Sequence, residues 1–236
     1  MTAVPRSLIV NADDFGQSAG INRGVIEAYE RGIVTSASVM VCWPAAAAAA
    51  SYARAHPWLS VGLHFDLGEW TFRDGGWHTI YMWVDPDDSS AVEREARMQL
   101  ERYRDLLGHD PTHLDSHQHI HRRAGVHEAL ERIAAELQVP LRHCSSVHHC
   151  GDFYGQSQTG EPLPHLIAAT TLAAMLRGLP AGVTELGCHP GYADDVESMY
   201  RAERRIELRT LCANEIRLVI ADEQIRLVSF CDVHGR

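Results

Sequence analysis

The sequence predicts an α/β fold: a single-domain (β/α) barrel-like structure, seven-stranded and incomplete or distorted. Short apolar runs alternate with helix-length segments along all 236 residues. This alternation is typical of right-handed βαβ units around a parallel sheet. Seven repeats suit an incomplete barrel better than an open sheet, although a doubly wound sheet is the alternative. No stretch rich in Pro, Gly or Ser divides the chain, so we expect residues 1–236 to form one domain.

Each expected strand is a short run of apolar and β-branched residues followed by a polar turn. The first run, SLIVN, has the apolar character of a buried strand, and the polar residues NADDFG begin where it ends. Later runs such as VTSASVMVCW and SVGLHFDL have the same form. The seven expected strands cover residues 7–11, 34–43, 60–67, 112–121, 141–147, 183–188 and 225–231.

The expected helices lie between these strands and carry their own start and stop signals. Ser18 can cap a helix that stops at Gly32, because Ser accepts a bond from a free helical N–H and Gly tolerates the turn that ends a helix. Pro44 suits the first turn of the alanine-rich helix that follows, since alanine is the best helix former. The expected helices cover residues 19–31, 44–55, 90–107, 124–137, 163–177 and 195–219, the last of them long enough to be broken.

The composition excludes several classes of protein. A formal charge of −10 and a pI near 5.8 argue against a nucleic-acid footprint and against attraction to an anionic membrane. Six cysteines are scattered without a CxxC pair, which fits neither a zinc ribbon nor a dense disulfide framework. The N-terminal apolar run is shorter than a signal peptide needs, and no segment approaches the roughly 20 apolar residues of a membrane span. We therefore expect a cytoplasmic protein.

Four strand ends carry Asp or His, which bind metals. The carboxyl ends of parallel strands meet at one rim of a barrel, so we expect these side chains to lie close together. A carboxylate from Asp13 or Asp14 with His64 and His117 would form a three-ligand site with open positions, which suits zinc or another divalent metal. The second carboxylate could then take a proton from a metal-bound water. The four blocks are NADDFG (11–16), GLHFDL (62–67), LDSHQHIH (114–121) and GCHPGY (187–192).

Polar residues occupy every second position from 113 to 121. In a continuous strand they would share one face, which could not be an ordinary apolar core. We expect Asp115 to orient an imidazole, because metal-bound histidines require a hydrogen-bond partner. We expect His113 to be structural and His119 to be the first alternative ligand. The residues on this parity are His113, Asp115, His117, His119 and His121.

These blocks resemble the signatures of the YdjC-like carbohydrate deacetylases. The matching segments are NADDFG, GLHFDL, THLDSHQHIH and ELGCHPGY. The family includes chitooligosaccharide deacetylase and a deacetylase associated with hopanoid biosynthesis. They stand in family order and span nearly the whole chain. The resemblance implies a metal-dependent deacetylase with a (β/α)-barrel-like fold. It also implies that Asp14, His64 and His117 bind the metal, that Asp13 is the general base and that His189 is the general acid.

Two further regions are candidates for substrate contacts. Residues 68–88 form a long segment rich in aromatic residues, and such segments are uncommon unless functional. Trp70 and Trp77 in this segment could stack on a sugar ring, or the aromatic rings could pack the segment onto the barrel. Arg142 could orient Asp13, hold substrate or form a surface ion pair. We assign Trp70, Trp77, His119 and Arg142 to substrate binding.

Two departures from simple patterns remain. Gln118 stands where relatives in this family often carry another histidine. The cluster His143, Cys144, His148, His149 and Cys150 matches no common zinc spacing, and a polar loop explains it as well as a metal site does.

The predicted function is hydrolysis of an acetyl group from an N-acetylated sugar or glycoconjugate. One divalent ion, Zn²⁺ or Mg²⁺, is the expected cofactor. A small acetylated carbohydrate is the expected partner, without nucleic acid or membrane, and a homodimer is left open. A metal-dependent phosphoesterase and a non-catalytic sugar-binding protein on the same fold are the alternatives. A Gly-rich phosphate cradle is absent from the sequence, which disfavours the first of these.

Overall fold

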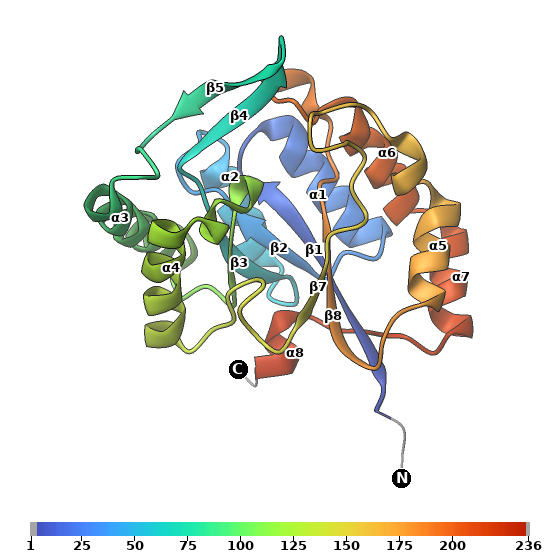
Figure 1. Ribbon diagram of the computed structural model, residues 1–236. Helices are drawn as coiled ribbons and strands as arrows, with labels where there is room; N and C mark the ends of the chain where they lie inside the picture. The colour runs from blue at the N-terminus through green and yellow to red at the C-terminus, as the bar shows by residue number, and fades with distance from the viewer. Residues whose placement is uncertain (1–3, 235–236) are drawn as a thin grey trace.

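The computed structural model describes residues 4–234; residues 1–3, where the N-terminal segment considered above begins, and 235–236 lie outside the described part. A parallel sheet in the order β6-β3-β2-β1-β8-β7, with β9 paired to β1, forms its centre (Figure 1). The sheet curls into a half-barrel, which confirms the predicted fold class. The strands are β1 (Arg6–Phe15), β2 (Ser36–Val39), β3 (Ser60–Phe65), β6 (Leu114–Ser116), β7 (His148–Cys150), β8 (Gly182–Cys188) and β9 (Arg226–Leu227).

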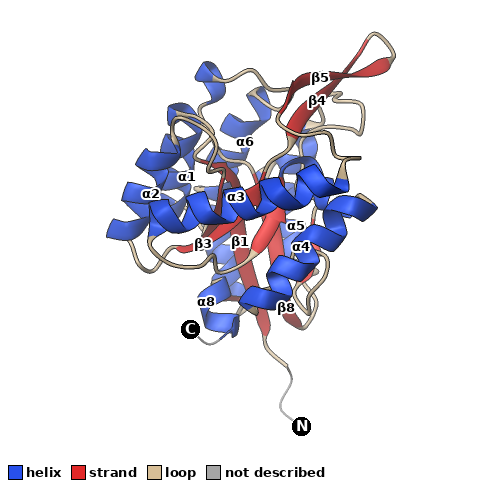
Figure 2. Cartoon of the chain, turned by 90° about the vertical axis from the view of Figure 1, so that its left-hand side faces the viewer, coloured by secondary structure: helices blue, strands red, loops and turns tan. Residues whose placement is uncertain are grey.

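Helices flank the sheet on both sides in Figure 1, and Figure 2 shows α3 crossing in front of the strands. The helix starting at Ala19 has its predicted bounds, because Ser18 accepts a hydrogen bond from the Ile21 N–H and Gly32 ends the helix. The helices are α1 (Ala19–Arg31), α2 (Ala46–Ala55), α3 (Ser89–Leu107), α4 (Ala124–Leu137), α5 (Ala169–Arg177), α6 (Ala202–Leu211), α7 (Asn214–Asp222) and α8 (Phe230–His234), with 3₁₀ turns η1 (His117–Arg122), η2 (Pro164–Ile167) and η3 (Ala193–Asp195).

The two faces of β1 differ in character. Leu8 and Val10 belong to the main core between the sheet and the helices. Ile9 points the other way and packs with Val147 and Phe230 of α8, inside the curl of the sheet. Further along the strand the same inner parity carries Asn11 and Asp13, because side chains alternate along a strand. The inner face therefore changes from apolar to polar toward the carboxyl end of β1.

Four expected strands differ from the structure. The strand predicted at 34–43 is shorter, because β2 covers only Ser36–Val39. The strand predicted at 112–121 ends at Ser116, because Gln118 and His119 adopt left-handed conformations with φ of 47° and 52° and turn the chain into η1. Residues 141–147 supply only one bridge, between Leu141 and Leu114, and the strand lies later, at β7. Residues 225–231 contain the two-residue β9 and then enter α8. The shared face expected for residues 113–121 therefore stops at Ser116.

The expected helix boundaries also need correction. The helix predicted at 163–177 is interrupted at Ala168, which has an extended conformation between η2 and α5. The helix predicted at 195–219 begins only at Ala202 and is broken as allowed, into α6 and α7, with Ala213 in an extended conformation between them. The helix predicted at 44–55 begins at Ala46.

The aromatic segment 68–88 is an antiparallel hairpin rather than an irregular loop, with strands β4 (Gly68–Arg73) and β5 (Gly76–Met82). It projects beyond the helices in Figure 2 and lies on the side toward which the arrowhead of β1 points in Figure 1. A buried carboxylate, Asp66, fixes its base: Tyr81 Oη and the indole N–H groups of Trp83 and Trp43 donate to it at 3.0–3.1 Å. Between residues 4 and 234, no helix has both the length and the apolar character that crossing a bilayer demands.

Candidate active site

A cleft of about 1040 Å³ opens at the carboxyl ends of the strands. The structure brings all nine predicted site residues to its walls, from the ends of four strands or the turns that follow them, from the segment after the Leu141 bridge and from the hairpin. This convergence follows from the parallel sheet, which directs every strand end to one rim. The predicted residues are Asp13, Asp14, His64, Trp70, Trp77, His117, His119, Arg142 and His189.

Asp13 and Asp14 are neighbours, and both face the cleft. In a regular strand they would point to opposite faces. The pairing of β1 with β2 is irregular between Ala12 and Phe15, and Asp14 has a left-handed φ of 65°. This local distortion turns both carboxylates toward the same space, and strained backbone of this kind is concentrated at functional sites.

Asp14 forms the centre of a three-residue group with His64 and His117. Its Oδ1 lies 3.2 Å from His64 Nε2 and 2.9 Å from His117 Nδ1. Its Oδ2 accepts a hydrogen bond from Arg204 at 2.6 Å. Burial opposes ionisation of Asp14, but Arg204 and His117 outweigh it and hold the pKa of this carboxyl well below its usual range. Asp14 is therefore a carboxylate whose free oxygen faces two imidazoles.

The two imidazoles are held by further carboxylates. His64 Nδ1 lies 2.7 Å from Asp115 Oδ1. This contact fixes the imidazole orientation as predicted and leaves Nε2 toward Asp14. His117 Nε2 lies 3.5 Å from Glu69 Oε2. Burial lowers the pKa of His64, yet Asp115 and Asp14 overcome this effect and raise the pKa to about 10.

These donors fit a divalent metal. His64 Nε2 is buried and makes no hydrogen bond, although Asp14 Oδ1 lies only 3.2 Å away. The potential ligand atoms of Asp14, His64 and His117 all lie within 4.8 Å of one another. Asp13, His64 and Asp115 form a second such group, but Arg142 contacts both of its carboxylates. The Asp14 group is therefore the better candidate metal centre.

Arg142 is buried beneath the cleft and contacts three carboxylates. Its guanidinium lies 2.7–2.8 Å from both oxygens of Asp13, 2.8 Å from Asp115 and 2.6 Å from Glu185. Burial opposes ionisation of Asp13, but Arg142 keeps its pKa well below the usual range. These contacts favour a role for Arg142 in orienting Asp13. Substrate contact by Arg142, which borders the cleft, stays a prediction.

His189 approaches the same Asp13 oxygen as Arg142 does. Its Nε2 is 3.8 Å from Asp13 Oδ2 and its Nδ1 is 3.8 Å from Glu207 Oε1. Its ring lies beside Tyr154 and Tyr200, with ring centroids 5.6 and 5.3 Å away. The imidazole is partly exposed to the cleft, so it can reach a bound molecule.

The hairpin places different aromatic residues in different environments. Trp70 and Trp77 line the cleft, whereas Trp83 is absent from its walls and is bonded to Asp66. Gln118 holds the hairpin from below, because its side-chain amide exchanges two hydrogen bonds with the backbone of Trp70. The packing interpretation is therefore correct for Trp83, and stacking of Trp70 and Trp77 on a sugar stays a prediction.

Four further histidines form a group beside the Asp14 centre. His119 and His121 lie on η1, His143 lies between α4 and β7, and His149 lies on β7. The centroids of their contacting rings are 4.6–5.8 Å apart. Burial and Arg142 lower the pKa of His121 to about 3, and burial and His149 lower the pKa of His143 to about 4. His119, the expected alternative ligand, thus belongs to this group instead of the Asp14 group.

Sequence reasoning missed several groups at the site. Arg204 pairs with Asp14 from α6, and Glu69 faces His117 from β4. Glu185 on β8 pairs with Arg142, and Glu207 on α6 faces His189. One sequence signal was available: Arg204 lies at helical spacing from Leu208 and Leu211, which places it on the buried face of α6.

The fold and these groups define a class of protein: a curled α/β barrel with a carboxylate and two imidazoles poised for a divalent metal. The chain belongs to the family described as YdjC-like protein, whose model matches residues 7–222. The predicted family resemblance is therefore confirmed.

Comparison with known proteins identifies relatives over nearly the full length. The chain is 35% identical to a chitooligosaccharide deacetylase of Klebsiella pneumoniae, with 97% of this chain and 99% of the relative covered. It is 33% identical to a carbohydrate deacetylase of Brevibacillus brevis, with 96% and 99% covered.

Two solved structures share the fold. A putative cellobiose-phosphate cleavage protein from Enterococcus faecalis has a TM-score of 0.79 at 24% identity, covering 98% of this chain and 99% of that one. A family 4 carbohydrate esterase from Streptomyces lividans, in complex with acetate, has a TM-score of 0.55 at 11% identity, covering 95% and 93%.

Proposed function

We propose that this protein is a metal-dependent carbohydrate deacetylase that removes an acetyl group from an N-acetylated sugar or glycoconjugate. One observation carries the proposal. The potential ligand atoms of Asp14, His64 and His117 lie close enough together to bind one ion, and beside them Asp13, a second carboxylate, accepts a hydrogen bond from Arg142. The names of the K. pneumoniae and B. brevis relatives support deacetylation of a carbohydrate.

In this proposal Asp14, His64 and His117 hold the metal. A divalent ion bound there supplies Lewis acidity toward the amide carbonyl and lowers the pKa of a bound water. The chain provides the proton transfers. Asp13, kept ionised and aimed by Arg142, accepts the proton of the attacking water. Hydrolysis breaks the amide C–N bond and releases acetate.

His189 is the proposed general acid. Its imidazole is partly exposed to the cleft and lies near Asp13, so it can hand a proton to the departing amine. Glu207 Oε1 lies 3.8 Å from His189 Nδ1, on the side away from Asp13. Trp70, Trp77 and His119, which line the same cleft, are proposed to contact the sugar.

The test is acetate release from a panel of N-acetylated sugars, including chitobiose, by metal-stripped protein supplied in turn with Zn²⁺, Co²⁺, Mn²⁺ or Mg²⁺. We expect release with at least one sugar, dependent on added metal. A phenyl phosphate ester in the same panel tests the phosphoesterase alternative. Binding of the sugars without acetate release under any metal would leave the sugar-binding alternative and reject the enzyme.

A further inference from the structure

The sheet is open between its two end strands, β6 and β7. The chain crosses this opening between Leu141, which bridges to Leu114 beside β6, and His148 at the start of β7. Four histidines stand where the crossing meets the cleft. His119 and His121 follow β6, His143 lies on the crossing segment, and His149 lies on β7.

Three of these imidazoles are close enough to bind one ion. The potential ligand atoms of His119, His121 and His143 all lie within 4.8 Å of one another. His121 Nε2 is 3.0 Å from His143 Nδ1. Two nitrogens bound tetrahedrally to one zinc at about 2.0–2.1 Å lie about 3.4 Å apart, so small side-chain shifts suffice.

The surroundings favour this arrangement over ordinary packing. His119 Nδ1 is buried and has no hydrogen-bond partner. Ser116 Oγ lies 2.6 Å from His121 Nδ1, so the ring can donate there and keep a lone pair on Nε2. His119 and His143 both have left-handed backbones, with φ of 52° and 67°. Strained residues persist where the surrounding structure has a use for their orientation.

We propose that His119, His121 and His143 form a second metal site, separate from the Asp14 centre, for zinc or a similar imidazole-binding transition metal. His149, whose ring centroid is 4.6 Å from that of His143, is the neighbouring group that can complete or adjust the coordination. A ligand set of neutral imidazoles suits Zn²⁺, Ni²⁺ or Cu²⁺. Mg²⁺ prefers oxygen ligands and octahedral geometry, so this site should reject it.

A metal at this site joins segments on the two sides of the opening. His119 and His121 are tied to the β6 side, and His143 lies on the crossing segment that leads to β7. The bound ion therefore stabilises the folded arrangement of the segments on the two sides of the opening, because it binds this arrangement and not the unfolded chain. The inference does not depend on the deacetylase activity.

The test is zinc stoichiometry by equilibrium dialysis and elemental analysis on metal-stripped protein. We expect two zinc ions per chain in the parent and one in His143→Asn. Asn tolerates the left-handed backbone of residue 143, and the side chain of His143 is exposed, so the variant should fold. His148→Asn is the matched control: it is exposed on the same short strand as His149 and points to the opposite side.

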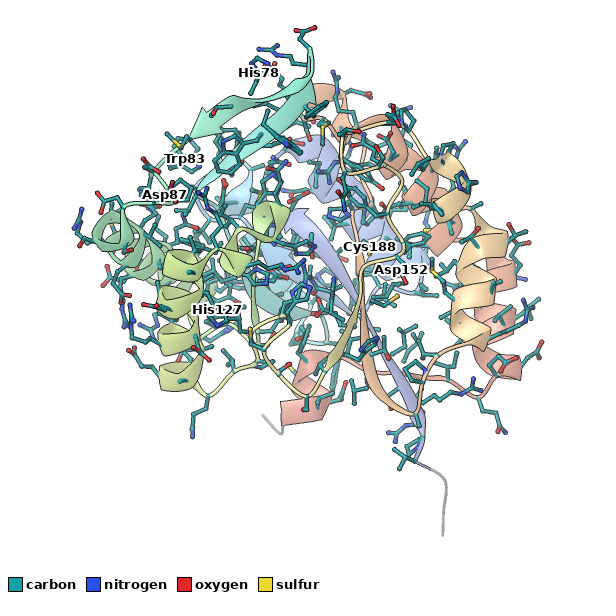
Figure 3. All side chains as sticks on the ribbon, in the orientation of Figure 1. His78, Trp83, Asp87, His127, Asp152 and Cys188 are labelled. Carbon is teal, nitrogen blue, oxygen red and sulfur yellow. The ribbon has the colours of Figure 1, made fainter. Side chains whose placement is uncertain are left out.

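A second measurement separates the two sites. In His117→Ala the Asp14 centre should be lost and the imidazole site kept, so one zinc should remain and zinc should still raise the melting temperature. In the parent saturated with Mg²⁺, added zinc should raise the melting temperature, and His143→Asn should lose this rise. His78→Asn, near the tip of the hairpin (Figure 3) and in neither group of potential ligands, should behave as the parent does.

Three results would overturn the proposal. They are a His143→Asn variant that binds as many zinc ions as the parent, a His117→Ala variant that binds none, and a His148→Asn control that loses an ion as His143→Asn does. Absence of acetate release with two zinc ions bound would reject the proposed function and leave this site standing.

Discussion

Replacing Asp13 with Asn should remove the proposed base while leaving the fold and the Asp14 centre in place. Asn has nearly the shape of Asp but cannot accept a proton at neutral pH. Arg142 contacts the two oxygens of Asp13 at 2.7 and 2.8 Å. The variant therefore keeps one acceptor for the guanidinium and turns an NH₂ group toward it.

The sizes of the two effects differ enough to be separated. Arg142 retains Asp115 and Glu185 at 2.8 and 2.6 Å, so the variant loses one hydrogen bond to a charged group, about 1.5–3 kcal/mol of stability. A domain with about 5–15 kcal/mol of stability stays folded after that loss. Loss of a general base lowers turnover by about 10²–10⁴-fold. A fall of that size in folded protein would be a chemical effect.

The assay measures acetate release beside metal content over a range of metal concentrations. Asp88→Asn is the control, because Asp88 caps α3 through its side chain and Asn caps a helix equally well. We expect Asp13→Asn to keep its metal and lose turnover, and Asp88→Asn to match the parent. Turnover within about tenfold of the parent would refute the base assignment. Loss of metal in Asp13→Asn would show that Asp13, and not Asp14, is the ligand.

Three further results are expected. His117→Ala should release the metal of the Asp14 centre and abolish acetate release together; an undiminished metal content would contradict the ligand assignment. Trp77→Ala should raise KM for sugars about fivefold, corresponding to about 1 kcal/mol of stacking, with little change for a small acetanilide, whereas Trp83→Ala should lower Tm and affect both substrates equally. Burial alone would raise the pKa of Glu185, but Arg142 outweighs burial and lowers it from an ordinary 4.5 to about 2. Glu185 therefore contributes stability above pH 4.5, and this stability is lost as the pH falls through 2. Glu185→Gln should therefore remove roughly 3 kcal/mol of that dependence, and superimposable acid-unfolding curves of variant and parent would contradict it.

Much of the fold was readable because its signals are local. Ser18 and Gly32 mark the ends of α1, and Ser60 begins β3 as expected. The site was readable for a geometric reason: parallel strands bring their carboxyl ends together, so acids and histidines at separate strand ends had to meet. That argument needs no knowledge of side-chain contacts.

The remaining features depend on contacts that sequence spacing does not encode. Two consecutive left-handed residues, Gln118 and His119, end β6 early, and nothing in LDSHQHIH indicates such a turn. Arg204 reaches Asp14 across 190 positions of sequence. The hairpin is a different case: Asp74 and Gly75, with φ of 52° and 78°, form a two-residue Asp-Gly turn that the sequence alone could have indicated.

Arg142 connects β1, β6 and β8 through Asp13, Asp115 and Glu185, and this junction limits how the protein can evolve. The proposed base and the carboxylates of two other strands contact the same guanidinium, so a substitution of Arg142 would disturb all three contacts together. The hairpin is attached separately, at Asp66. Residues around Trp77 can therefore be exchanged, and substrate preference altered, without disturbing Asp13. Single substitutions beneath the cleft instead break several ion pairs at once.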